Sequence, residues 1–318
     1  MQSFRKLSRF AKYAWFVLAS SLVVVLWGVF LRASKSGDGC GQHWVTCNGE
    51  VIPAAPQLKT IIEFTHRVSS SLDGIFIIVL LVCAVVAWRR SRSAAAKRVL
   101  LTAVGSFVFV VIEGLLGAGL VLTGNTAENL TPERPFWMAA HLVNTLILLA
   151  FLTMTAWQAS TDNRIRFRTE TKFAAALMAC AVLIFTVGIS GSIAALSSMI
   201  FPAETLAEGF AKDVSPTSHM LLRLRLLHPI LAIATGVFLI FITGWLRSHR
   251  PNNASIASWS TTVSAVVIAQ LAFGAATLLT LAPIVMQLGH LLLADTVWIG
   301  FVIFSAYFLS EDEPAQSI

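Results

Sequence analysis

Residues 61–88 read IIEFTHRVSSSLDGIFIIVLLVCAVVAW, and this stretch decides the class of protein. From Ile75 onward it contains no charged residue. At a rise of about 1.5 Å per residue, a helix of this length exceeds the thickness of a bilayer hydrocarbon core, which is roughly 30 Å. The stretch therefore predicts a helix that crosses a membrane.

The rest of the chain extends this interpretation. Of its 318 residues, 56% are hydrophobic and only 12% are charged, about half the charged fraction of a soluble domain. The composition excludes disordered, collagen-like and disulfide-scaffold proteins, since there are only four cysteines, 19 glycines and ten prolines. Eight stretches have the length and apolarity of membrane spans: 14–31, 61–88, 99–122, 136–157, 173–193, 221–246, 258–281 and 284–309.

Positive charge is distributed unequally between the two sets of connections. Fifteen of the 23 lysines and arginines lie before the first span or in alternate loops after it, and seven lie on the opposite side. Because cytoplasmic loops carry the excess of lysine and arginine, both termini are predicted to be cytoplasmic, in a multi-pass protein of the cell membrane. The net charge of +7 is then a topology signal, and no nucleic-acid partner is expected.

The two halves of the chain resemble each other in the spacing of selected residues. Five pairs are displaced by 149 to 162 positions: His66 and His228, Gly74 and Gly236, Gly28 and Gly188, Glu113 and Gln270, and His141 and His290. Four spans per half mean that both halves enter the membrane in the same sense. The predicted fold is an all-α integral membrane protein with eight transmembrane helices, arranged as two pseudo-twofold-related four-helix bundles, residues 1–160 and 161–318.

Spans 2, 4, 6 and 8 each carry a histidine near the predicted outer end: His66, His141, His228 and His290. An ionisable residue inside a membrane is a functional hypothesis by default, and the simpler alternative is a hydrogen bond to a neighbouring helix. Imidazoles on facing helices can bind both axial positions of a haem iron. A compact zinc or copper site would require closer ligand spacing or carboxylates. The pattern favours haem, with one site in each half.

The predicted outer loop before span 2 contains Cys40 and Cys47 in a turn-rich stretch. On the oxidising side of the membrane this pair favours a disulfide that holds the loop, and redox or haem-handling chemistry is the alternative. His43, His219 and His249 lie in or beside loops and are interpreted as solvated residues.

The motif Glu63-Phe-Thr-His66-Arg67, the cysteine pair before it and the later histidines resemble the haem A synthase family, in the type with an outer-loop cysteine pair. The resemblance extends over about residues 10 to 310. It implies an enzyme that oxidises the C8 methyl group of haem O to a formyl group. The product would be the haem A used by terminal oxidases.

The resemblance also implies roles for individual residues. His228 and His290 would hold a haem b cofactor in residues 161–318, and His66 and His141 would bracket the substrate haem O in residues 1–160, with Glu63 beside them. If both of the latter histidines bind iron, no axial position is open to oxygen, so one histidine dissociates or the oxidant acts at the ring edge. Haem O synthase and oxidase assembly factors are implied as partners, and the electron donor is not identified.

Three alternatives remain open at this stage. The repeat counterpart of Glu63 is Arg225, which indicates one catalytic and one cofactor half, or else an ion pair between the halves. A di-haem cytochrome that exchanges electrons with quinol would use all four histidines but gives Glu63 no role. A transporter would use Glu113 and Asp295 for coupling and would leave the histidines unexplained.

Overall fold

The computed structural model describes residues 7–161, 163–165 and 170–310, and eight segments of these are long and apolar enough to cross a membrane. Seven spans are single helices: α1 (Arg9–Ala33), α2 (Leu58–Ser91), α3 (Ala94–Leu122), α4 (Arg134–Ser160), α5 (Thr171–Ile200), α9 (Ala254–Leu279) and α10 (Ile284–Phe308). The sixth span consists of two consecutive helices, α7 (Met220–Arg225) and α8 (Leu227–Ser248). A short helix, α6 (Leu206–Val214), precedes it. The predicted all-α fold with eight spans is confirmed.

The break in the sixth span has a local cause. Pro229 has no amide hydrogen, and its ring crowds the carbonyl group four residues earlier, which belongs to Arg225. The first helix ends at Arg225, and the second begins at Leu227. His228 therefore lies at the start of α8, next to the discontinuity.

Helix ends follow the local sequence closely. Ser8, Ser93 and Asn253 cap α1, α3 and α9 with side-chain oxygens that accept amide hydrogens of the first turn. Between α9 and α10 the chain reverses within four residues, with positive φ at Leu281 and Ala282. Pro283 is the N-cap residue of α10, and as a proline it cannot continue the preceding helix.

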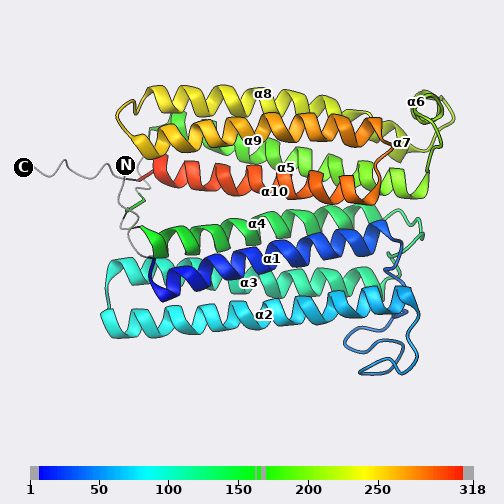
Figure 1. Ribbon diagram of the computed structural model, residues 1–318, viewed down its shortest axis with the longest axis horizontal. Helices are drawn as coiled ribbons and strands as arrows, with labels where there is room; N and C mark the ends of the chain where they lie inside the picture. Colours follow the sequence, from blue (N-terminus) through cyan, green and yellow to red (C-terminus); the bar gives the residue numbers. More distant parts are fainter. Residues whose placement is uncertain (1–6, 162, 166–169, 311–318) are drawn as a thin grey trace, which may run out of the picture.

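The helices form two adjacent bundles, α1 to α4 in one and α5 with α7 to α10 in the other (Figure 1). In the first bundle, α2 and α4 each pack against both α1 and α3, so they lie diagonally across the bundle. The bundles meet where α4 packs on α5 and α10, and where α1 packs on α10. In the predicted repeat, α1 corresponds to α5 and α4 to α10, so a twofold axis would turn the α4–α5 contact into the α10–α1 contact and would leave the α4–α10 contact in place. The observed contacts are consistent with such an axis, which stays a prediction.

A hydrogen bond joins the two bundles near the middle of α10. Trp298 Nε1 in α10 donates a hydrogen bond to the Leu146 carbonyl oxygen in α4 at 2.7 Å. Fully buried side chains such as Leu149, Leu152 and Phe304 pack around this contact. Apolar residues on the outside, for example Ile75, remain exposed, as expected for a surface that faces lipid.

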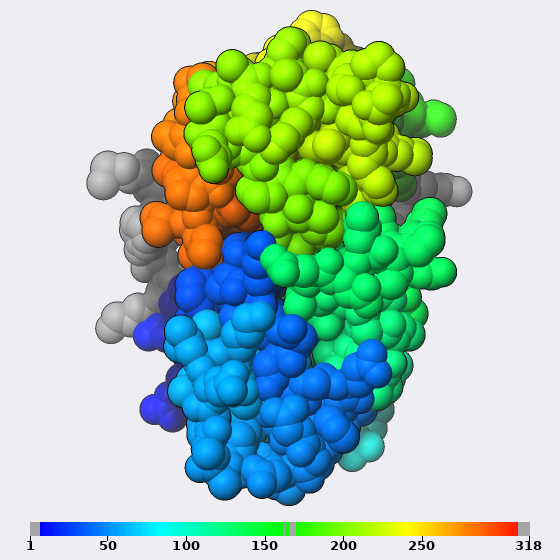
Figure 2. All heavy atoms as spheres, turned by 90° about the vertical axis from the view of Figure 1, so that its right-hand side faces the viewer, coloured from blue at the N-terminus to red at the C-terminus, as the bar shows by residue number. Residues whose placement is uncertain are grey.

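One end of the molecule carries the longest connections, and Figure 2 views that end. The segment between α1 and α2, in blue, and the α3–α4 connection, in green, lie over the first bundle. The yellow-green segment around α6 and α7 lies over the second bundle. The four histidines of interest occur at this end of α2, α4, α8 and α10.

Candidate haem-binding site

His228 and His290 face each other in the second bundle. Their ring centroids are 6.3 Å apart, and their ring planes are nearly perpendicular, at 88°. Two imidazoles on opposite sides of one metal, each bound at about 2.0–2.1 Å, place their centroids roughly 6 Å apart. The spacing of this histidine pair therefore fits a single metal between them.

Neighbouring polar groups lie near both rings of this pair. His228 Nδ1 is 3.0 Å from Ser190 Oγ, which leaves Nε2 as the ligand atom. Gln270 Nε2 lies 3.5 Å from His290 Nε2. His290 Nδ1 is buried and makes no hydrogen bond within the described part of the chain.

Three of the four imidazoles lie against a helical glycine. A Cβ atom on Gly191 would lie 2.9 Å from His228 Cε1, one on Gly274 would lie 2.7 Å from His290 Cε1, and one on Gly28 would lie 3.0 Å from His66 Cε1. These distances are too short for a methyl group, so the glycines permit the rings to occupy their positions. Gly28 packs on His66, and the glycine with the same role beside His228 is Gly191. Gly188, the predicted counterpart of Gly28, faces Leu142 instead.

His66 and His141 occupy the equivalent ends of α2 and α4 in the first bundle. Their helices lie diagonally across the bundle, so both rings come from opposite walls. The Nδ1 atoms of both are buried and have no hydrogen-bond partner among the described residues. A buried nitrogen without a hydrogen-bond partner is costly.

Glu113 of α3 is the polar neighbour of His141. Its Oε1 atom lies 3.6 Å from His141 Nδ1. Asn144 and Thr145 of α4 each donate a hydrogen bond to this carboxylate, both at 2.5 Å. The sequence analysis gave Glu113 as the repeat counterpart of Gln270 and as a coupling residue of the transporter alternative, and it did not assign His141 to it as a neighbour.

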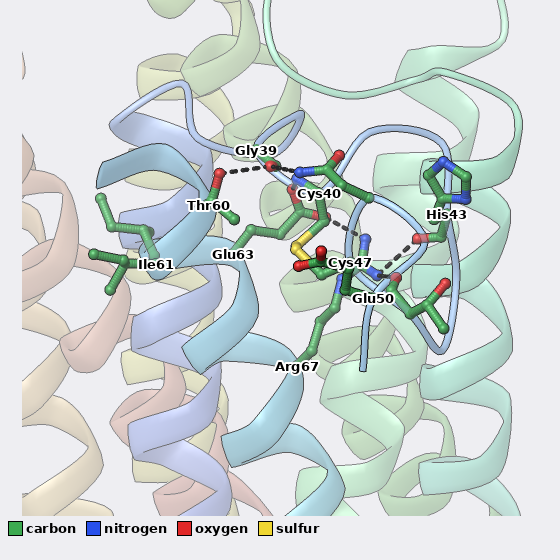
Figure 3. The surroundings of a disulfide bond; sticks show 12 residues. Gly39, Cys40, His43, Cys47, Glu50, Thr60, Ile61, Glu63 and Arg67 are labelled. Atoms are coloured by element: carbon green, nitrogen blue, oxygen red, sulfur yellow. Dashed lines mark hydrogen bonds and ion pairs between the residues drawn. A yellow bond between two sulfur atoms is a disulfide. The ribbon is translucent and has the colours of Figure 1, made fainter. Parts of the chain in front are cut away.

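Glu63 is buried under the disulfide loop, with 3% of its side chain exposed (Figure 3). Its Oε2 atom accepts the Cys40 amide hydrogen at 2.8 Å, and its Oε1 atom accepts a hydrogen bond from Arg67 at 2.5 Å. Arg67 also donates to the carbonyl oxygens of His43 and Thr46. Glu63 and Arg67 therefore attach the start of α2 to the loop.

Cys40 and Cys47 form the predicted disulfide, with their Cα atoms 4.4 Å apart. Both cysteines are buried, and the bond closes the loop directly over Glu63 (Figure 3). The structure confirms the covalent link that was expected to hold this loop. A chemical role for the sulfur atoms stays a prediction.

The alternative of an ion pair between Glu63 and Arg225 is wrong. Arg225 pairs instead with Asp213 of α6, and its Nη1 atom lies 3.3 Å from Ser198 Oγ. Each charged residue is thus neutralised within its own half. The physical reason is proximity, because Arg67 follows Glu63 by one helical turn on the same face.

A shallow, open cavity of about 360 Å³ lies next to the end of α4 that carries His141. Its lining is mainly apolar and consists of Leu116, Glu133, Phe136, Trp137 and Ala140. Ala140 directly precedes His141. The cavity therefore presents mainly apolar side chains close to the position of His141.

Comparison with known proteins agrees with this arrangement. The family model of COX15-CtaA, described as cytochrome oxidase assembly protein, matches residues 11–302. A protein of Thermus thermophilus named protoheme IX farnesyltransferase is 40% identical over 295 residues, which are 93% of this chain and 48% of that protein. The chain therefore spans about half the length of that relative.

Heme A synthases match over a shorter region. The protein of Halalkalibacterium halodurans is 37% identical over 131 residues, 41% of this chain and 42% of its own. The protein of Bacillus mycoides is 35% identical over 147 residues, 45% of this chain and 42% of its own. With the family model covering nearly the whole chain, and with relatives of these names, the protein belongs to the COX15-CtaA family of cytochrome oxidase assembly proteins, which includes the haem A synthases.

Proposed function

We propose that this protein is a haem A synthase, which oxidises the C8 methyl group of haem O to a formyl group. The observation that carries the proposal is the facing pair of imidazoles from α8 and α10, together with a second histidine pair at the same ends of α2 and α4. Family membership supports the reaction class. One bound haem would supply electron transfer and the other would be the substrate.

The two halves have different roles in this proposal. His228 and His290 in residues 161–318 hold a haem b cofactor. His66 and His141 in residues 1–160 hold haem O, whose apolar part can extend toward the cavity beside Ala140. The positive-inside distribution supports cytoplasmic termini and haem sites near the outer face of the cell membrane.

Glu63 is the proposed acid–base residue. Conversion of a methyl group to a formyl group by hydroxylation and then dehydration is a four-electron oxidation whose oxidant must come from outside the chain, and its steps require proton transfers near the substrate. Glu63 lies one turn beyond His66, and the Cys40 amide and Arg67 donate the hydrogen bonds that hold its carboxyl group in place. Its burial under the loop keeps this carboxyl group away from bulk water.

The name of the Thermus relative supports a second candidate function, transfer of a farnesyl group to protohaem IX. That protein is about twice as long as this chain, so its name applies to more than the matched region. A haem O synthase would attach the farnesyl group, and this protein would then oxidise the methyl group. We therefore propose a haem O synthase as a partner. Oxidase assembly factors are proposed as recipients of the product.

The decisive assay supplies haem O to membranes that contain the protein and extracts the pigments formed. Wild-type protein is expected to produce haem A, and Glu63→Gln to reduce its rate by roughly a hundredfold or more. Glu128→Gln, an exposed carboxylate in another outer connection, is the matched control and should leave the rate unchanged. Haem A formation at the normal rate by Glu63→Gln would eliminate the acid–base role, and haem O formation from protohaem IX and farnesyl diphosphate would favour the second function.

A further inference from the structure

Glu113 is held in one orientation by the helix that carries His141. Asn144 and Thr145 follow His141 by three and four residues, so they lie on the same face of α4. Asn144 Nδ2 donates to Glu113 Oε2 and also to the Phe109 carbonyl oxygen, and Thr145 Oγ1 donates to Glu113 Oε1. Both donors are buried, at 5% and 7% exposure. The carboxylate is therefore fixed beside the imidazole.

The corresponding positions of the other half lack this arrangement. The repeat counterpart of Glu113 is Gln270, a neutral amide that lies near His290. The residues three and four after His290 are Leu293 and Ala294, which cannot donate side-chain hydrogen bonds. Gln270 Oε1 is buried and has no hydrogen-bond partner in the described part of the chain. The acid and both of its donors occur only in the first half.

We propose that Glu113 is a positioning residue that orients His141 and strengthens its imidazole as a metal ligand. A ligating histidine generally donates its second ring N–H group to a carboxylate or carbonyl oxygen, which fixes the tautomer and raises the basicity of the ligand nitrogen. Glu113 Oε1 lies 3.6 Å from the otherwise unpartnered Nδ1 atom, and a small ring rotation would close this distance to a hydrogen bond. His141 then presents Nε2 to the iron. The inference rests on the proposed haem site in the first half.

The consequence is an electronic difference between the two haem sites. An anionic acceptor makes the imidazole more electron-donating and stabilises ferric iron, whereas a neutral amide does so far less. The haem bound by His66 and His141 should therefore have a lower reduction potential than it would have beside a glutamine. A structural role alone, joining α3 to α4, would not change that potential.

The test uses purified protein in detergent and titrates it with haemin, measuring affinity, visible spectrum and midpoint potential for each site. Glu113→Gln keeps the shape and hydrogen-bonding capacity of the side chain while removing its charge. It is expected to weaken haemin binding at the first site by roughly tenfold or more and to raise the potential there. The haem signal of the second site serves as the internal control for folding.

Unchanged affinity and potential at the first site in Glu113→Gln would overturn the inference. If that variant does not fold, the double change Asn144→Leu and Thr145→Ala introduces the side chains of the other half and releases the carboxylate. It should move the potential in the same direction, and an unchanged potential would again overturn the inference. A separate measurement tests whether the first half binds haem at all. If it does not, His66→Ala and His141→Ala will leave the number of haemin molecules bound per protein unaltered.

Discussion

Helical glycines set the positions of three of the four imidazoles. Gly191 and Gly274 each face a histidine ring at a distance shorter than real Cβ contacts, and Gly28 faces His66 at 3.0 Å, which is tighter than most such contacts. Glycine inside a helix is otherwise unfavourable by roughly 0.5–1 kcal/mol relative to alanine. The close approach of the histidine rings explains why glycine occupies these three positions. Substitution of these glycines therefore tests where the rings lie.

Gly274→Ala is therefore expected to displace His290 and abolish haem binding in the second half, although alanine favours the helix itself. Gly244→Ala in α8 is the matched control, because a Cβ atom there has no neighbour within 4 Å. Visible absorption of the two purified variants makes the comparison. A normal haem spectrum in Gly274→Ala would show that the ring does not occupy this position.

At the same scale, the sequence singled out candidate residues but did not predict the partners that these residues contact. Histidines on alternate spans were found because helix spacing alone places them at one level. The Arg67 contacts depend on carbonyl groups of His43 and Thr46, in an irregular loop whose path no periodicity predicts. Glu113 was missed as a neighbour of His141 because diagonal and adjacent helices cannot be distinguished from span order.

At the scale of elements, the predicted spans agree with the observed helices, and the differences are local. Span 6 is divided because the ring of Pro229 would clash with the carbonyl group of Arg225, four residues earlier, in a continuous helix. The short helix α6 was not predicted, since its nine residues are amphipathic rather than uniformly apolar. Asp213 of α6 binds Arg225 of α7, which joins this helix to the start of the sixth span.

The disulfide loop is the element whose contribution to stability can be measured. Closing a loop of eight residues is worth about 2.5 kcal/mol in the chain-entropy model. Reductant should lower the thermal unfolding midpoint of the wild-type protein and should have no effect on the double variant Cys40→Ser and Cys47→Ser. An equal shift in both proteins, or none in the wild type, would contradict a structural role for the bond.

At the scale of the whole molecule, two bundles carry their longest connections at one end (Figures 1 and 2), and the four histidines lie at that end of α2, α4, α8 and α10. Hydropathy predicted eight spans, because length and apolarity are properties of each segment alone. The order of packing around each bundle depends on side-chain contacts between distant segments, such as Trp298 with Leu146. Part of the charge count behind the predicted orientation, namely Arg5, Lys6, Arg166 and Arg168, lies outside the described residues.

The orientation makes a direct prediction for labelling in intact cells. With Cys83 and Cys180 replaced by alanine, a cysteine at Glu204 should react with a membrane-impermeant maleimide. A cysteine at Asn252, in the connection at the opposite end, should react only after the membrane is permeabilised. The reverse pattern would place the histidine sites on the cytoplasmic side.

The central claim is that the four histidines form two distinct haem sites, one for a cofactor and one for a substrate. Pigment analysis of the purified protein and its single alanine variants tests it most directly. His228→Ala and His290→Ala should lose bound haem b, whereas His66→Ala and His141→Ala should retain haem b and fail to form haem A. A colourless wild-type protein, or four variants that all remove the same single haem, would contradict the account.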